Sequence, residues 1–288
     1  MVDTGEIEET PKKLTDKNVL YDKDGATWMR STDFGDDKDF VVVKSNGDVT
    51  YTTTDIAYHV NKFDRGFDHV IDVMGADHHG HVGPMEAGLE ALGYDKKNLE
   101  FHLYQLVHLF RGGKQVKMSK SSGEFVTLEE LLDEVGVDAS RYFYLMRSSD
   151  THLNFDLDLA KSKSMDNPVY YVQYAYVRCK AILANDELPE INLDEETPYF
   201  DGEAELNLVR DLISFPDEVL GAANSRTPNR ICTYAEKLAN SFHSFYHDCR
   251  VLGESSEIQK RRLLLVFATM KVIESALSIL GVSAPDRM

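Results

Sequence analysis

The sequence predicts an α/β part followed by an all-α part. Up to about residue 160, β-rich runs and helical stretches follow one another as strand, turn, helix, strand, which is typical of a parallel sheet. From about residue 165 onward no strand signal is found, and apolar residues recur at helical spacing. A chain of 288 residues is long enough for two such domains. We therefore predict domains at 1–164 and 165–288.

The elements of the first part follow from turn residues and apolar runs. FVVVKSNGDVTYTT reads as two β-rich runs around Asn46-Gly47, a pair that favours a type I′ hairpin. HVIDVMGADHHG is a buried strand that ends in a glycine turn, and FHLYQLVHLF is a second such strand. Between them, PMEAGLEALGY predicts a helix that ends at Gly93.

Helix caps mark the later elements. Thr127 and Glu130 form a predicted capping box, and Asp138 is predicted to cap the helix SRYFYLMRS. Asn167 and Pro168 start a helix in which one apolar face recurs, and three further helices are expected at about 203–222, 228–250 and 257–280, the last ending at Gly281. The apolar faces consist of Val169, Val172, Tyr176, Cys179 and Leu183, and of Ile231, Tyr234, Leu238, Phe242, Phe245 and Cys249.

The composition is that of a globular protein in a reducing compartment. The chain is 42% hydrophobic with a mean hydropathy of -0.35, and no apolar run is expected to reach the ~20 residues of a membrane span. The stretch MVDTGEIEETPKKL has no apolar h-region and is not expected to be a signal peptide. Three widely spaced cysteines, Cys179, Cys232 and Cys249, favour the cytoplasm and buried thiols. The net charge of -18 makes a polyanionic partner less expected without excluding one.

The segment KMSKSSG places two lysines, a hydroxyl and a glycine just before a predicted helix start. Lys117 and Lys120 are point charges that suit a phosphate group, and the helix N-terminus near Thr127 adds to the field. By composition alone, a solvated surface turn is the more common structure for such a loop. The specific tetrapeptide after a βαβ strand favours a triphosphate site instead.

Two further clusters allow alternatives. Asp77, His78, His79 and His81 lie in one turn, where four zinc ligands are poorly placed for a tetrahedron, whereas a glycine turn at a strand end suits a nucleotide. Tyr51 and Asp55 share one helix face if the helix has begun by Tyr51, but by spacing alone Asp55 is better explained as an N-cap.

These segments together resemble the bacterial arginyl-tRNA synthetase family over essentially all 288 residues. The resemblance implies a Rossmann-like catalytic part with the second class I nucleotide signature, followed by a helical anticodon-binding domain. Its first signature, His-Ile-Gly-His, is not found here. We therefore expect the chain to correspond to the C-terminal half of such an enzyme and to be inactive alone. The supporting stretches are VTYTTTDIAYHVNKFDRGFDHVIDVMGADHHGHV, VKMSKSSGEFVTL, EVGVDASRYFYLMRSSDTHLNFDLDLA, NPVYYVQYAYVRCKAIL and LGVSAPDRM.

The resemblance also implies a role for each candidate residue. Lys117, Ser119 and Lys120 are implied to be catalytic, and a basic residue that often follows in relatives is replaced by Ser121. The implied arginine-binding residues are Tyr51, Asp55 and His78, and the implied ATP-binding residues are Gly75, Asp77, His81 and Met118. The implied tRNA-binding residues are Tyr171, Tyr174, Arg178, Arg287 and Met288, with Arg226 and Arg230 as weaker candidates. Without the resemblance, the tyrosines are better explained as core.

The implied reaction joins arginine to its tRNA through an arginyl-adenylate. ATP with Mg²⁺ enters as a substrate, no protein-bound zinc or other metal is expected, and the full-length enzyme is expected to be a cytoplasmic monomer without a membrane partner. A cysteinyl-tRNA synthetase is a rival, but it needs zinc-binding cysteines and residues 1–178 contain none. A non-catalytic tRNA-binding module is a second rival. A nucleotidyltransferase is a third, although it leaves the helical half unexplained.

Overall fold

The computed structural model describes residues 5–116, 127–189, 191, 199–200 and 202–288. The chain divides into two compact units, Met1–Leu106 and Val107–Met288, which are described one at a time. This structural division differs from the predicted functional one at 164/165, which stays a prediction. The described residues 107–116 and 127–161 thus belong to the same unit as the helical part that follows them in the chain.

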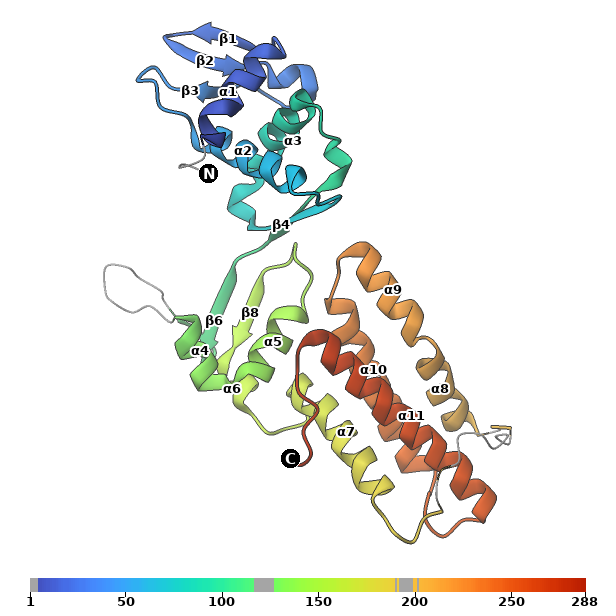
Figure 1. Ribbon diagram of the computed structural model, residues 1–288. Coiled ribbons are helices and arrows are strands. Elements are labelled where there is room, and N and C mark those ends of the chain that lie inside the picture. The colour runs from blue at the N-terminus through green and yellow to red at the C-terminus, as the bar shows by residue number, and fades with distance from the viewer. Residues whose placement is uncertain (1–4, 117–126, 190, 192–198, 201) are drawn as a thin grey trace. The chain divides into compact units, whose positions relative to one another are not determined.

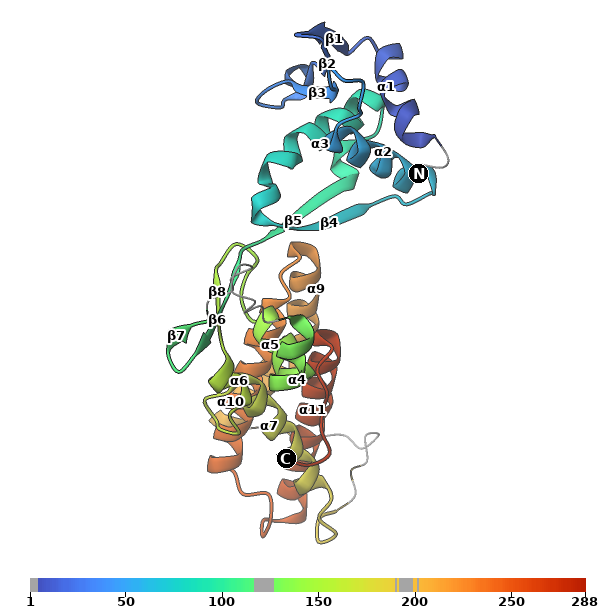
Figure 2. The same ribbon diagram turned by 90° about the vertical axis from the view of Figure 1, so that its left-hand side faces the viewer.

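The first unit contains an antiparallel sheet and a parallel strand pair (Figures 1 and 2). Its first elements are α1 (Glu6–Asp16), β1 (Leu20–Lys23), β2 (Ala26–Met29) and β3 (Phe40–Val43), with the strands in the order β1-β2-β3. They are followed by α2 (Tyr51–Asp64), β4 (Val70–Gly75), α3 (His79–Leu92) and β5 (Leu99–Tyr104). β4 and β5 pair in parallel from Val70↔Leu99 to Gly75↔Tyr104, so the predicted βαβ unit is confirmed.

Packing of α2 and α3 holds the parallel strands. Ile56 and Val60 of α2, Met85 and Leu89 of α3, and Val70 and Leu99 of the strands form one buried apolar cluster. Gly88 of α3 is required there, because a Cβ at this position would lie 2.4 Å from Cδ1 of Ile56. α3 ends at Gly93 as predicted, but it begins at His79 rather than at Pro84.

Two predictions in the first unit are wrong. Asn46-Gly47 does not form a type I′ turn, because only Gly47 has a positive φ, of 88°, and the Lys44 amide bonds the Asp48 carbonyl across a three-residue loop. The run after this loop makes a single bridge, Val43↔Val49, and then becomes α2. Thr50 caps α2, and Thr53, in the first turn of the same helix, is buried. The capping interaction therefore outweighed the preference of the threonines for a strand.

The second unit begins with a small sheet and three short helices. β6 (Val107–Arg111) pairs with β7 (Lys114–Gln115) and, in parallel, with β8 (Leu153–Asp156). The single strand predicted for FHLYQLVHLF is therefore wrong, because β5 and β6 belong to different sheets. α4 (Leu128–Val135), α5 (Val137–Leu145) and α6 (Leu157–Lys161) accompany this sheet, and the Thr127–Glu130 capping box of α4 is confirmed.

Among the described residues, the second unit continues with five longer helices: α7 (Pro168–Leu183), α8 (Glu203–Ile213), α9 (Phe215–Ser225), α10 (Asn229–Asp248) and α11 (Ser256–Leu280). The helix predicted at 203–222 is thus two helices, and Pro216 in the first turn of α9 lacks the amide needed to continue α8. Asn167 caps α7 and Gly281 ends α11, as predicted.

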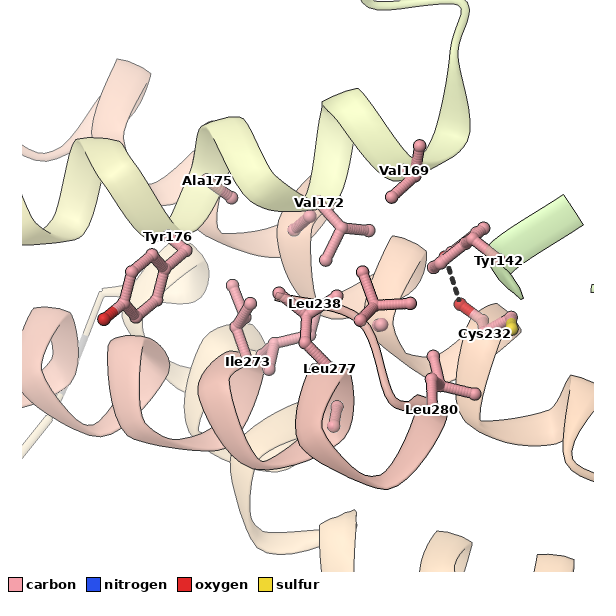
Figure 3. Close-up of a cluster of buried hydrophobic side chains, with 14 of the residues drawn as sticks. Tyr142, Val169, Val172, Ala175, Tyr176, Cys232, Leu238, Ile273, Leu277 and Leu280 are labelled. Carbon is pink, nitrogen blue, oxygen red and sulfur yellow. Dashed lines mark hydrogen bonds between the residues drawn. The ribbon is translucent and has the colours of Figure 1, made fainter. Parts of the chain in front are cut away.

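One continuous apolar core joins α5, α7, α10 and α11. Figure 3 shows Val172, Leu238, Ile273 and Leu277 meeting from three helices, with Tyr142 of α5 donating its hydroxyl to the Cys232 carbonyl at 3.2 Å. The predicted apolar faces of α7 and α10 are buried here, and all three cysteines are buried and unpaired.

α11 corrects the expectation that no segment is apolar enough to span a bilayer. An 18-residue window of this helix has a mean hydropathy of 1.9, so length and composition alone permit a span. In the structure, Leu263, Val266, Ile273 and Leu277 of α11 are buried against the other helices (Figure 3). We therefore interpret α11 as the core helix of the bundle.

Asp138 does not cap α5. The cap position is Gly136, and Asp138 lies in the first turn, where its carboxylate accepts from the Ser283 amide at 3.0 Å and from Nε2 of Gln173 at 2.9 Å. The side chain thereby links α5 to α7 and to the segment after α11. This partner lies 145 residues away in the chain, so local sequence carried no sign of it.

Candidate functional site

The first turns of α2 carry the predicted arginine-binding pair. Because Thr50 is the cap, Tyr51 begins the helix and Asp55 lies one turn later on the same face. The explanation of Asp55 as an N-cap is therefore wrong. Tyr51 is 63% exposed, whereas Asp55 is half-buried, so the pair offers an aromatic ring at the surface and a carboxylate beneath it.

Burial raises the pKa of the Asp55 carboxyl above its ordinary value. Electrostatic attraction from His59 and His81 and a hydrogen bond from Tyr51 partly offset this effect, and the Asp72 charge adds to it. A buried carboxylate of this kind gains most from a cationic ligand, because the ligand replaces the lost hydration with a charge-assisted contact. The arrangement suits a guanidinium.

The start of α3 brings two histidines to this pair. The His81 ring lies 5.8 Å from the Tyr51 ring, edge to face, and the His78 and His81 rings are 5.4 Å apart. His78 was predicted at the arginine and His81 at ATP, and the structure places His81 directly against the arginine-binding pair. Both assignments stay predictions.

Gly75 and Asp77 lie at the carboxyl end of β4. A Cβ at residue 75 would be 2.5 Å from Oδ1 of Asp77, so only glycine leaves room for the Asp77 carboxylate to fold back over the strand end. Ligands of parallel α/β sheets bind at such strand ends. The positions therefore suit the predicted ATP contacts.

The predicted residues Lys117, Met118, Ser119 and Lys120, together with Ser121, lie outside the described residues. The described chain leads up to them through the β6–β7 hairpin and resumes at the capped start of α4. The acidic first turn of α4, Glu129 and Glu130, is stabilised by the helix dipole.

Three buried side chains beneath Asp55 were missed by sequence reasoning. His59 lies one turn after Asp55 on α2 and contacts Asp72 of β4, which also pairs with Lys62. Two signals pointed to them. Asp72 is a charged residue at an inward position of an apolar strand, and His59 follows Asp55 at the i, i+4 spacing.

A second candidate surface lies on α7 and α10. Tyr171 is partly buried against the core, with its ring 5.0 Å from the His243 ring, so its aromatic surface is only partly accessible. The Tyr174 ring lies 5.8 Å from the His243 ring and stacks with Tyr170 at 6.4 Å. We call Tyr170, Tyr174, Arg178, His243 and Tyr246 the α7–α10 face.

Arg178 is held within this face by aromatic rings. Its guanidinium lies 4.1 Å from the Tyr246 ring centroid and 5.7 Å from that of Tyr174, and Nη1 donates to the Tyr174 hydroxyl at 2.9 Å. Burial, and secondarily the Arg178 charge, lowers the pKa of His243 to about 4. The face therefore presents one fixed cation and several rings, with a neutral imidazole between them.

The remaining candidate tRNA-binding residues differ in whether their side chains are exposed or engaged in contacts. Arg287 and Met288 are exposed at the end of the chain, and the segment before them is held by ion pairing of Asp286 with Lys180 of α7. Arg230 pairs with Glu218 at 2.5 Å, and Nη1 of Arg226 donates to the Ala223 carbonyl at 3.0 Å. Arg230 of α10 thus pairs with a residue of α9, whereas Arg226, at the C-cap of α9, bonds a carbonyl of α9 itself.

A parallel βαβ unit with polar groups at its strand ends, followed by a helical bundle with an aromatic and basic face, is the arrangement expected of a class I aminoacyl-tRNA synthetase. Two family models agree: the catalytic domain of class I (R) tRNA synthetases matches residues 2–153, and the DALR anticodon binding domain matches residues 172–288. The chain belongs to the arginyl-tRNA synthetase family.

Individual relatives support this membership. Arginine–tRNA ligase of Carboxydothermus hydrogenoformans is 51% identical over 291 residues, which cover 99% of this chain and 52% of that protein. A Campylobacter jejuni structure described as an arginyl-tRNA synthetase is 33% identical with a TM-score of 0.86, over 98% of this chain and 62% of that one. Thermus thermophilus arginyl-tRNA synthetase shares the fold, with a TM-score of 0.82 at 21% identity over 100% of this chain and 59% of that one. The chain spans about half the length of the curated relatives that it matches.

Proposed function

We propose that this chain forms the arginine-recognising and anticodon-binding part of an arginine–tRNA ligase. The observation that carries the proposal is the half-buried Asp55 carboxylate, with the Tyr51 ring above it and the His81 ring beside Tyr51. A carboxylate can take a guanidinium bidentately, and an aromatic ring can stack on its plane. Few other amino-acid side chains use both contacts.

The proposed reaction has two steps. The arginine carboxylate attacks the α-phosphorus of ATP and releases pyrophosphate. A hydroxyl of the terminal ribose of arginine tRNA then attacks the carbonyl of the arginyl-adenylate, which forms the arginyl ester and releases AMP. Gly75 and Asp77 would lie by the adenosine, and Lys117 and Lys120 would bind the phosphates. Catalysis would then rest on positioning and on electrostatic stabilisation of the leaving pyrophosphate.

The α7–α10 face is the proposed contact for the anticodon arm. Aromatic rings can stack on unpaired bases of any sequence, and the Arg178 cation can support a stacked base or a phosphate. Arg287 and Met288, exposed at the chain end, would extend this contact. ATP would enter with Mg²⁺, and the enzyme would work as a cytoplasmic monomer. The burial of α11 within the bundle supports a role away from membranes.

Arginine recognition can be tested at Asp55. The change Asp55→Asn should weaken L-arginine binding by about 2–5 kcal/mol and leave ATP binding almost unchanged, since it removes one partner of a buried charge pair. Binding is measured calorimetrically in a chimera in which this chain replaces the aligned part of the Carboxydothermus enzyme. L-Citrulline, which lacks the charge, should already bind the unsubstituted chimera poorly.

The matched control is Asp64→Asn at the end of the same helix, where the carboxylate accepts from the Tyr94 hydroxyl at 2.8 Å. It should leave the arginine affinity unchanged. Equal arginine affinity in Asp55→Asn and the unsubstituted chimera would contradict the proposal.

A further inference from the structure

Beneath Asp55, unit 1 buries three ionisable side chains, His59, Lys62 and Asp72, which we call the buried ionic cluster. Nε2 of His59 lies 2.5 Å from Oδ2 of Asp72, and Nζ of Lys62 lies 2.8 Å from Oδ1 of the same carboxylate. The three side chains are only 3%, 15% and 10% exposed. Removing such groups from water costs free energy that their mutual attraction repays only in part.

The cluster connects directly to Asp55 through His59. Nδ1 of His59 lies 2.8 Å from the Asp55 carbonyl oxygen, while Nε2 faces the Asp72 carboxylate. Nε2 also lies 3.1 Å from Nζ of Lys62, so the His59 ring contacts both other members of the cluster as well as Asp55. The charge of His59 acts to lower the pKa of the Asp55 carboxyl, against the larger effect of burial.

Stability alone does not account for these residues. α2 already packs on β4 through Ile56, Val60 and Val70, all buried in one apolar cluster. Well-packed apolar side chains in place of a buried ionic group are often neutral or stabilising. The cluster joins two elements that carry predicted site residues. α2 carries Tyr51 and Asp55, and β4 reaches Gly75 three residues after Asp72.

We infer that His59, supported by Asp72 and Lys62, is a positioning residue that fixes Asp55 and keeps its carboxylate ionised for a cationic substrate side chain. The inference rests on the proposed arginine site. The groups that face Asp55 are Tyr51 and His59 from α2, His81 from α3 and Asp72 from β4. Of these, His59 alone both bonds the Asp55 backbone and carries charge into the interior.

The first test is made on the 288-residue chain without substrate. The pKa of the Asp55 carboxyl is measured by carbon-13 NMR in the unsubstituted chain and in His59→Gln, which keeps a donor and removes the charge. Burial already raises this pKa, and loss of the His59 cation should raise it further. The matched control is His69→Gln. His69 lies just before β4, and its exposed side chain pairs with Glu100 at 3.0 Å.

His69→Gln should leave the Asp55 titration unchanged. An Asp55 carboxyl that titrates alike in folded His59→Gln and in the unsubstituted chain would overturn the inference. If His59→Gln does not fold, Lys62→Met is measured instead, because it removes one positive charge and its contact with Nε2 of His59, and leaves the His59 contacts with Asp55 and Asp72 in place. It should raise the Asp55 pKa by a smaller amount, and no rise would overturn the inference equally.

The second test separates this inference from the proposed function. In the Carboxydothermus chimera, His59→Gln should weaken L-arginine binding on the order of ten- to a hundredfold through misplacement of Asp55, with ATP affinity unchanged. If Asp55→Asn weakens arginine but His59→Gln does not, the positioning role is wrong and the arginine site stands. If neither change alters arginine binding while His59→Gln still shifts the Asp55 pKa, the arginine site is wrong and the electrostatic link stands.

Discussion

The two candidate surfaces differ in the buried residues that lie beneath them. In unit 1, Tyr51, Asp55 and His81 stand over a buried ionic cluster, so the charge of the interior reaches the site. In unit 2, the α7–α10 face covers the continuous apolar core, and its partly buried imidazole, His243, has a pKa lowered to about 4, which favours the neutral form. We therefore expect that substitutions that change charge have their largest effects in unit 1, whereas substitutions that change packing have their largest effects in unit 2.

The largest expected effect is loss of core packing in unit 2. Phe242 of α10 is fully buried beside His243, and Phe242→Ala should lower the free energy of unfolding by about 3–5 kcal/mol. Urea denaturation followed by far-UV circular dichroism measures this loss. Ile279→Ala, at a residue 53% exposed on α11, is the control and should stay within about 0.5 kcal/mol. A loss below 1 kcal/mol for Phe242→Ala would remove the contrast between the two units.

Acidification should destabilise unit 2 through His243. The folded pKa of about 4 is lower than the ordinary value near 6.5, so the unfolded chain binds a proton first as the pH falls. Stability is therefore fully present above about pH 6.5 and should fall by about 1–2 kcal/mol toward pH 4, after allowance for partial exposure. Thermal unfolding at several pH values measures it.

His243→Phe should flatten that part of the pH dependence. His247→Phe is the matched control, because His247 lies on the same helix with its side chain 88% exposed. An unchanged pH slope in His243→Phe would show that other groups cause the acid loss.

Base stacking on the α7–α10 face sharpens the comparison further. Tyr174→Ala should weaken binding of the arginine tRNA anticodon arm by roughly 1–3 kcal/mol with little change in salt dependence. Tyr174→Phe keeps the ring and loses only the hydroxyl that accepts from Arg178, so it should bind nearly as the unsubstituted chain does. Fluorescence anisotropy at low salt measures both, and binding no tighter than to an unrelated hairpin would exclude RNA recognition by this face.

The smallest expected effect is loss of the Thr127–Glu130 capping box, which follows Lys117 and Lys120 in the chain. Thr127→Ala should cost about 1 kcal/mol, expressed as faster hydrogen exchange of the first α4 amides, because Thr127 accepts from the Glu130 amide at 3.1 Å. Thr127→Ser keeps the acceptor oxygen and should exchange at the original rate. Equal exchange in the alanine and serine variants would mean that the cap contributes nothing to α4.

Features that depend on neighbours in the chain were predictable. The caps Thr127 and Asn167, the helix ends Gly93 and Gly281 and the apolar faces of α7 and α10 lie where sequence patterns placed them. The break between α8 and α9 was also marked, by Pro216, but helical periodicity on both sides concealed it. Each of these features is decided by contacts within a few residues.

Features that depend on distant partners were not predictable in the same way. The sequence by itself determined the α/β-then-helical order, the spacing of Tyr51 and Asp55, and the family, because these depend on local periodicity and on motif order. Only the tertiary structure decided that His81 meets Tyr51, that Asp138 bonds the segment after α11, and that Asp72 faces His59. The physical reason is that burial and charge pairing arise when separate elements pack together, and residue spacing along the chain does not specify which side chains then meet.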